Sequence, residues 1–266
     1  MKLIDAHNHL HDARLAPHLP EILPTLDLQC AVVNGTHEDD WPAVASLAAE
    51  HSWVLPSFGL HPWQVAGRTP HWLDALRRQL DAHPHAGVGE IGLDCWIEGH
   101  DLADQTRVFT AQLALAAERN LPVTIHCIQA WGALWDVIRT HPLPARGFLI
   151  HAYGGSLEMM RSFAGRGAYF SFSPHFLHER KTAQRAVFAA IPGERLLVET
   201  DAPDLRPPDE RNTHPLFDAA GAPLNHPANI AVAYAGLASV RGIEIETLAE
   251  TVAANFTRLF QNTVRH

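Results

Sequence analysis

The segment Ile4-Asp5-Ala6-His7-Asn8-His9-Leu10 places two histidines two residues apart, directly after an apolar start. Side chains alternate between the two faces of a β-strand, so this spacing puts His7 and His9 on the same face. Two neutral imidazoles that converge from the end of one strand provide half of a transition-metal site. The chain has 19 histidines, however, and such a pair also occurs by chance. The other strands must decide between these interpretations.

Short apolar runs recur along the chain, and helical patterns separate most of them. Predicted strands cover residues 4–10, 30–35, 54–60, 86–92, 122–126, 147–151, 169–173 and 195–201. Predicted helices cover residues 39–51, 70–82, 101–119, 129–140, 156–164, 178–190, 228–240 and 244–261. The proline-rich segment 203–227 lacks helical periodicity and is expected to form a loop over one end of the sheet. Continuously apolar strands that alternate with helices indicate a parallel sheet covered by helices.

Eight such units predict an α/β fold, a TIM-type (β/α)8 barrel, with residues 1–266 in one domain. An open doubly wound sheet is the alternative. That fold normally has a glycine-rich phosphate loop after its first strand, where this chain has His9-Leu10-His11-Asp12. The barrel is therefore preferred.

Composition limits the function classes. The formal net charge is −9, which argues against a protein that grips duplex DNA through its own basic face. If phosphate is the substrate, bound metal must supply much of the positive charge. The N-terminus lacks a signal-peptide pattern, no window approaches about 18 unbroken apolar residues, and Cys30, Cys95 and Cys127 cannot all pair. Reduced thiols, a cytoplasmic location and no membrane partner are expected.

In a barrel of this type the active site lies where the strands end. The residues near the predicted strand ends are of metal-ligand types: His7, His9, His61, Glu90, His126, His151 and Asp201. Each has a structural alternative, such as a buried histidine hydrogen-bonded to backbone, but coincidence accounts poorly for so many strand ends. Four imidazoles and two carboxylates suffice for two ions bridged by a shared carboxylate and a solvent molecule.

Several local segments resemble the TatD family of metal-dependent hydrolases. They are Asp5 to Leu10, Gly59 to Pro62, Gly89 to Asp94, Pro122 to His126 and Glu199 to Pro203, together with Gln105, Phe109, Gln112, Asn225, Pro227 and the closing residues 255–260. This resemblance runs nearly end to end. It implies an amidohydrolase-type barrel, two divalent metal ions and deoxyribonuclease activity.

The resemblance also implies a role for each matching position. It assigns His7, His9 and Asp201 to one ion, His126 and His151 to the other, and Glu90 to a bridge between them. His61 matches a position beside the site, where substrate contact is expected, and its structural alternative is a histidine fixed before Pro62 in a turn. Asp201 and Glu90 are the expected catalytic residues, with Asp201 accepting the proton of a metal-activated water.

The chain departs from its apparent relatives where a substrate would rest. Cys127-Ile128 stands where relatives often have an arginine, Ala152-Tyr153 follows His151, and Cys95-Trp96 follows Asp94. The expected substrate contacts from loops at the mouth are His61, Tyr153 and Arg206, with Trp63, Trp96 and His175 as further candidates. Aromatic side chains there can stack on bases of single-stranded nucleic acid, and packing is the alternative role for each tryptophan.

These observations predict a hydrolase that cleaves phosphodiesters at single-stranded or frayed DNA ends. A hydrolase of a small ester, lactone, amide or phosphoester on the same site is the first alternative, and a non-catalytic metal-binding module is the second. Mixed His and carboxylate ligation suits Zn²⁺, Mn²⁺, Fe²⁺, Ni²⁺ or Co²⁺, and Mg²⁺ less well. The sequence does not define the oligomeric state, and a monomer is compatible with it.

Overall fold

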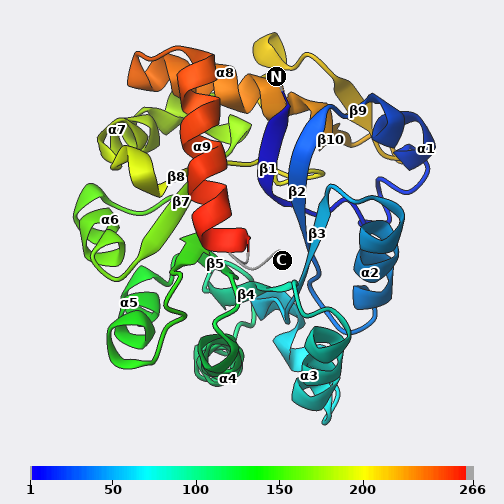
Figure 1. The fold of residues 1–266 in the computed structure, drawn as a ribbon, viewed down its shortest axis with the longest axis vertical. Coiled ribbons are helices and arrows are strands. Elements are labelled where there is room, and N and C mark those ends of the chain that lie inside the picture. Colours follow the sequence, from blue (N-terminus) through cyan, green and yellow to red (C-terminus); the bar gives the residue numbers. More distant parts are fainter. Residues whose placement is uncertain (1, 262–266) are drawn as a thin grey trace.

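The computed structural model describes residues 2–261, which form an eight-stranded parallel sheet whose strands follow one another in sequence order (Figure 1). The strands are β1 Leu3–Asn8, β2 Leu28–Asn34, β3 Val54–Phe58, β4 Gly87–Asp94, β5 Val123–Ile128, β6 Phe148–Ile150, β7 Ala168–Phe172 and β8 Leu196–Val198. They are almost entirely buried, and all eight residues of β4 are. Both faces of the sheet are therefore covered, which explains the continuously apolar runs in the sequence.

Helices surround the sheet in a ring (Figure 1). They are α1 Leu19–Ile22, α2 Trp41–Glu50, α3 Trp72–Ala82, α4 Leu102–Arg119, α5 Trp131–Thr140, α6 Leu157–Ala164, α7 Thr182–Ala190, α8 Ile230–Arg241 and α9 Ile245–Phe260. The predicted (β/α)8 barrel is confirmed, and each predicted strand overlaps an observed one. No helix within residues 2–261 is long and apolar enough to cross a membrane.

Backbone hydrogen bonds bring the two ends of the sheet together, so that the barrel is nearly closed. The amide of Asp201 donates to the carbonyl of His7 at 3.0 Å, and the amide of His9 donates to the carbonyl of Ala202 at 2.8 Å. Inside this seam, the Asp5 carboxylate accepts hydrogen bonds from the amide and hydroxyl of Thr200. The seam therefore fixes the segment after β1 against the segment after β8.

Two local expectations need correction. The predicted helix 178–190 begins only at Thr182, because 3-10 turns at Pro174–Leu177 and Glu179–Lys181 precede it. The segment 203–227 contains an antiparallel hairpin, β9 Pro215–Phe217 with β10 Pro223–Asn225. Strands of three residues are too short to show an alternating pattern in the sequence.

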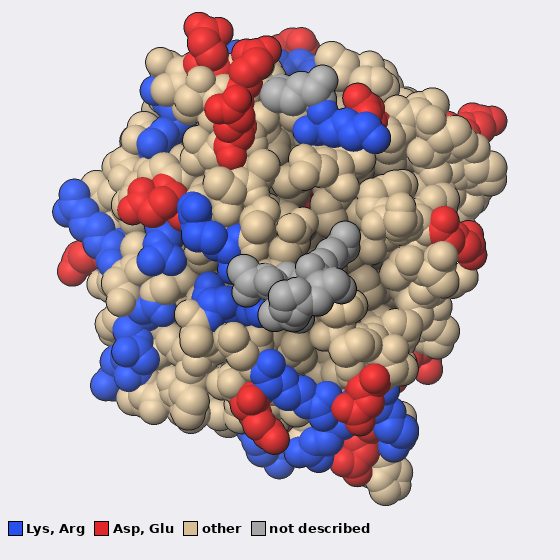
Figure 2. All heavy atoms as spheres, viewed as in Figure 1, with Lys and Arg blue, Asp and Glu red and all other residues tan. Residues whose placement is uncertain are grey.

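Charged side chains of both signs occur on the face shown in Figure 2, where Lys and Arg share the left and lower parts of the molecule with Asp and Glu. Asp and Glu also occur along the top of this face (Figure 2).

Candidate metal centre

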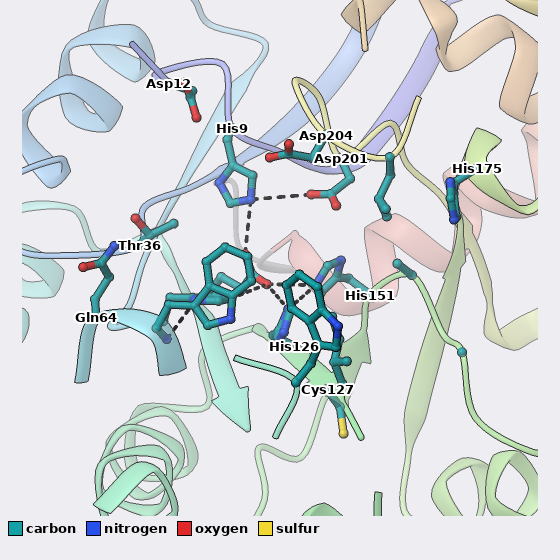
Figure 3. Close-up of a pocket in the computed structure, with 18 of the residues that line it drawn as sticks. His9, Asp12, Thr36, Gln64, His126, Cys127, His151, His175, Asp201 and Asp204 are labelled. Carbon is teal, nitrogen blue, oxygen red and sulfur yellow. Dashed lines mark hydrogen bonds and ion pairs between the residues drawn. The ribbon is translucent and has the colours of Figure 1, made fainter. Parts of the chain in front are cut away.

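A cavity of about 1260 Å³ opens where the strands end, and residues near or after the carboxyl end of every barrel strand line it (Figure 3). His9 and Thr36 come from the β1 and β2 side, and His175 lies on the far side of the cavity from Thr36. This is the end at which barrel enzymes hold their active sites. A cavity therefore lies at the end of the barrel where the sequence predicts the site.

Glu90 lies at the centre of the histidine cluster, and its side chain is 3% exposed. Its Oε2 lies 3.2 Å from Nε2 of His9 and 3.4 Å from Nε2 of His7. Its Oε1 lies 2.8 Å from Nε2 of His151 and 2.9 Å from Nδ1 of His126. The two oxygens of one carboxylate thus face two different pairs of imidazoles.

Asp201 completes the first of these groups. Its Oδ1 lies 3.2 Å from Nε2 of His7 and 3.5 Å from Nε2 of His9, and the two imidazole nitrogens are 3.2 Å apart (Figure 3). The backbone of Asp201 has φ of +56°, a left-handed conformation that a non-glycine residue rarely adopts outside constrained sites. The side chains of His7, His9 and Asp201 therefore converge on one point.

The donor atoms fit divalent metal ions. Three groups have ligand atoms within 4.8 Å of one another: His7, His9 and Asp201; His7, Glu90 and His151; and His61, Glu90 and His126. Donors that share an ion at about 2.1 Å in tetrahedral geometry lie about 3.4 Å apart. Glu90 Oε1 is also buried without a hydrogen-bond partner among residues 2–261, although imidazole nitrogens surround it. A cation between these atoms would satisfy it.

Two hydrogen bonds and one longer ion-pair contact behind the cluster orient three of its imidazoles. Nδ1 of His9 donates to the carbonyl of Asn34 at 2.7 Å, which leaves Nε2 for the cluster. Nε2 of His126 contacts Asp94 Oδ2 at 2.8 Å, and Nδ1 of His151 lies 3.5 Å from Glu199 Oε1. Such outer partners fix the tautomer and orientation of ligating histidines. The sequence alone does not identify Asn34, Asp94 and Glu199 as partners of these histidines, although Asp94 and Glu199 lie inside the segments that carry the family resemblance.

Electrostatics keep the carboxylates of the cluster ionised. Burial would raise the pKa of Glu90, but the neighbouring His151 and His61 hold it well below its ordinary value. Burial acts in the same way on Asp201, and hydrogen bonds from His7 and His9 lower its pKa instead. For Asp94, bonds from His126 and Trp63 outweigh burial and lower the pKa to about 2. Carboxylates that stay ionised in a buried site are suited to binding cations, and ligating imidazoles give up their protons when a metal ion binds.

Gly92 allows β4 to approach His126 closely. Its φ is +151°, and a Cβ built on it would lie 2.0 Å from the carbonyl oxygen of His126. No side chain fits at that distance, because the obstacle is the backbone of the neighbouring strand. The glycine in Glu90-Ile91-Gly92 is therefore required by the packing of the cluster.

The expected substrate contacts divide into two groups. His61 lies inside the cluster: its Nδ1 accepts from the amide of Trp63, and its Nε2 lies 3.4 Å from Glu90 Oε1. Burial lowers the pKa of His61 to about 4, so this imidazole is neutral near pH 7. Trp63, Trp96 and His175 line the cavity.

Tyr153 and Arg206 do not line it. Tyr153 is fully buried against Trp131 and Phe170, and its hydroxyl donates to the carbonyl of Ser156 at 2.8 Å. The expectation that Tyr153 contacts substrate is therefore corrected. Its ring packs in the core against Trp131 and Phe170 and does not face the cavity. The Arg206 guanidinium pairs with Asp209 in its own loop and is outside the set of cavity-lining residues.

The barrel and its cluster of imidazoles and carboxylates define a metal-dependent hydrolase. The family model described as TatD related DNase matches residues 4–261. The chain therefore belongs to the TatD-related DNase family.

Individual relatives agree with this assignment. The chain is 32% identical over 235 residues to the 3′-5′ ssDNA/RNA exonuclease TatD of Citrobacter koseri, with 86% of each chain covered. It is 27% identical over 263 residues to the uncharacterized metal-dependent hydrolase YabD of Bacillus subtilis, with 97% of this chain and 99% of that one covered. Among solved structures, YjjV, a TatD homologue from Escherichia coli K12, matches with a TM-score of 0.88, 26% identity and 98% of each chain covered.

Proposed function

We propose that this protein is an exonuclease that hydrolyses phosphodiesters at the 3′ ends of single-stranded nucleic acid, with two divalent metal ions in the cavity. The observation that carries the proposal is the position of Glu90, whose two oxygens face His7 and His9 on one side and His126 and His151 on the other. A carboxylate placed in this way suits a bridge between two ions. The named activity of the Citrobacter koseri relative supports the substrate class and the polarity.

We assign His7, His9 and Asp201 to one ion, His126 and His151 to the other, and Glu90 to both. Bound divalent ions would lower the pKa of a water molecule and neutralise phosphate charge. The donor set suits Zn²⁺, Mn²⁺, Fe²⁺, Ni²⁺ or Co²⁺ better than Mg²⁺, because imidazole prefers the softer cations.

Asp201 is the residue that accepts a proton. Its carboxylate lies at the cavity, with Oδ1 3.2 Å from Nε2 of His7 and 3.5 Å from Nε2 of His9. An ionised carboxylate within hydrogen-bond reach of the attacking water can take the water's proton. The role of Glu90 is to contribute one carboxylate oxygen to each of the two groups of ligands.

The charge around the cavity favours a short anionic substrate end. Arg180 and Lys181 line the wall after β7, and within residues 2–261 no carboxylate forms an ion pair with either. The wall after β1 differs, since Arg14 there is neutralised by ion pairs of 2.8 Å to both Asp12 and Asp204. A substrate that places one or two phosphates near the β7 wall fits this asymmetry better than a long duplex does.

The test is an activity panel on metal-free protein reconstituted with each divalent metal. Substrates are single-stranded DNA and RNA labelled at the 3′ or 5′ end, a simple phosphodiester and a simple carboxylic ester. We expect stepwise loss of nucleotides from the 3′ end, and at least a thousandfold lower rate for Asp201→Asn, roughly the scale of losing an essential proton acceptor. Hydrolysis of the ester alone would establish the small-molecule alternative instead.

We further propose that residues 1–266 form one domain and act in the cytoplasm. One large apolar cluster, which includes residues from Ile4 in β1 to Phe260 in α9, supports the single domain. An odd number of cysteines supports a reducing compartment. A single cooperative unfolding transition and recovery in the cytosolic fraction would test these two statements.

A further inference from the structure

We infer that Trp63 and Trp96 form the surface on which this protein binds a nucleobase next to the scissile phosphodiester, and that Trp63 links this surface to the metal cluster. The inference rests on the proposed function and goes further, because it assigns base recognition to two residues of this chain.

Both tryptophans are exposed to solvent, whereas a tryptophan that packs in the core is buried. Trp63 is 45% exposed and Trp96 is 63% exposed, and both line the cavity. Their ring centroids lie 6.3 Å apart with an interplanar angle of 33°. Ile128, which is 37% exposed, also lines this wall. The wall after β3, β4 and β5 is therefore apolar and largely aromatic.

This surface begins at the metal cluster. The Trp63 ring lies 5.2 Å from the His61 ring at a right angle and 6.4 Å from the His126 ring. Trp96 then extends the aromatic surface away from the cluster. The sugar joins each base to its own phosphate, so a nucleotide whose phosphate reached the cluster could bring its base to these rings.

The chemistry of the two walls points to the same ligand. β3 and β4 stand opposite β7 and β8 in an eight-stranded ring, so the tryptophans face the wall that carries Arg180 and Lys181. One wall thus offers flat apolar rings and the other offers cations, with the cluster between them. A single-stranded nucleic acid presents both a flat base and a phosphate backbone, whereas a small aliphatic ester presents neither.

Trp63 has a second contact that makes it a positioning residue. Its Nε1 donates to Asp94 Oδ2 at 2.8 Å, and the same oxygen is 2.8 Å from Nε2 of His126. Movement of the indole would therefore disturb the carboxylate that orients a proposed metal ligand. Loss of the ring and loss of its N–H group should have separable effects.

The test measures binding without turnover. The probe is a fluorescent octathymidylate with phosphorothioate linkages, whose binding to the metal-loaded protein is followed by anisotropy. We expect Trp96→Ala to weaken binding about 5- to 150-fold, which is the scale of one stacked base. Phe217→Ala is the matched control, because Phe217 is 54% exposed but lies in β9, outside the cavity. It should leave binding unchanged.

Abasic probes show whether the lost contact is made to a base. Probes that lack the last or the next-to-last base should bind the wild-type protein more weakly at one of these positions, by a factor similar to that of Trp96→Ala. The same probe should bind Trp96→Ala no more weakly than the full probe does. Equal affinities for all probes, or an equal loss in Trp96→Ala and Phe217→Ala, would overturn the inference.

The Trp63 variants separate its two roles. Trp63→Phe keeps a ring without the N–H group, so it should retain probe affinity within about twofold. It should bind the metal of the His126 group more weakly than the wild type, by less than the roughly 10- to 100-fold expected for loss of Asp94, the direct partner of His126. Trp63→Ala should lose both. Full metal affinity in Trp63→Phe would overturn the positioning role.

Failure of the proposed function gives a different pattern. If the protein did not cleave oligonucleotides but Trp96→Ala still weakened base-dependent probe binding, the base surface would stand and the exonuclease assignment would fall. If cleavage occurred with no base dependence, the exonuclease assignment would stand and the base surface would fall.

Discussion

Glu90 Oε1 lies 2.8 Å from Nε2 of His151, while the other oxygen of the same carboxylate faces His7 and His9. β4 supplies the carboxylate, β1 supplies the His7 imidazole, and the residue that follows β6 supplies the His151 imidazole. The cluster is thus assembled by barrel closure, since its members are far apart in the sequence.

Replacing Asp94 by Asn should weaken metal binding. Asp94 Oδ2 lies 2.8 Å from Nε2 of His126, and the negative charge of this carboxylate orients the imidazole and increases its basicity. An amide at this position lacks that charge. We expect a loss of about 10- to 100-fold in affinity, measured by titration with a competing chelator. Asp136→Asn is the control, because Asp136 pairs with Arg139 through exposed side chains on α5. The role of Asp94 would be refuted by equal affinities in the two variants.

Replacing Gly92 by Ala should disrupt both the fold and the cluster. The new Cβ would lie 2.0 Å from the His126 carbonyl oxygen, so one of the two strands must move. We expect a loss of at least about 2 kcal/mol in the free energy of unfolding, measured by urea denaturation. Gly132→Ala has no atom within 4 Å of its Cβ in α5 and should stabilise the protein slightly. Similar stabilities would contradict the close approach described for β4 and β5.

Stability should fall in mild acid partly because of His226. Burial, followed by the nearby His214, lowers the pKa of His226 to about 4 from 6.5, and its Nδ1 accepts a hydrogen bond from the Ala228 amide. Between these pH values the unfolded chain binds a proton that the folded chain does not, so the free energy of unfolding falls as the pH drops from 6.5 to 4.

His226→Asn tests this assignment, because asparagine can accept the same backbone hydrogen bond without titrating. Urea denaturation at about pH 7 and about pH 5 should show a smaller loss of stability in the variant than in the wild type. An unchanged loss would show that His226 does not contribute.

Removing the two cations of the β7 wall should weaken the dependence on salt. Arg180 and Lys181 line the cavity, and each phosphate contact to a single strand contributes a slope of about 0.7 in log affinity against log salt. Arg180→Ala with Lys181→Ala should raise KM for oligonucleotides and reduce this slope by up to about 1.4. The control is Arg161→Ala on α6, outside the cavity-lining set. An unaltered slope in the double variant would argue against phosphate contacts at this wall.

The sequence predicted the barrel well, because buried parallel strands read as short apolar runs and because ligand-type residues recur at their ends. His7 and His9 could be paired from strand periodicity alone. The partners behind the cluster could not be assigned, since the contacts of Asp94, Glu199 and Asn34 depend on the three-dimensional pairing of strands. Tyr153 shows the same limit: a residue that follows a strand can point into the core or into the cavity, and only packing decides between them.

The number of divalent ions bound per chain tests the central claim most directly. Metal content should be measured by elemental analysis after reconstitution and gel filtration, for the wild type and for Glu90→Gln, with Glu98→Gln as a control outside the cavity-lining set. We predict two ions for the wild type and for the control, and loss of at least one ion in Glu90→Gln, because a neutral amide is a poor bridge between cations. Two ions retained in Glu90→Gln, or a single ion in the wild type, would contradict the bridged centre.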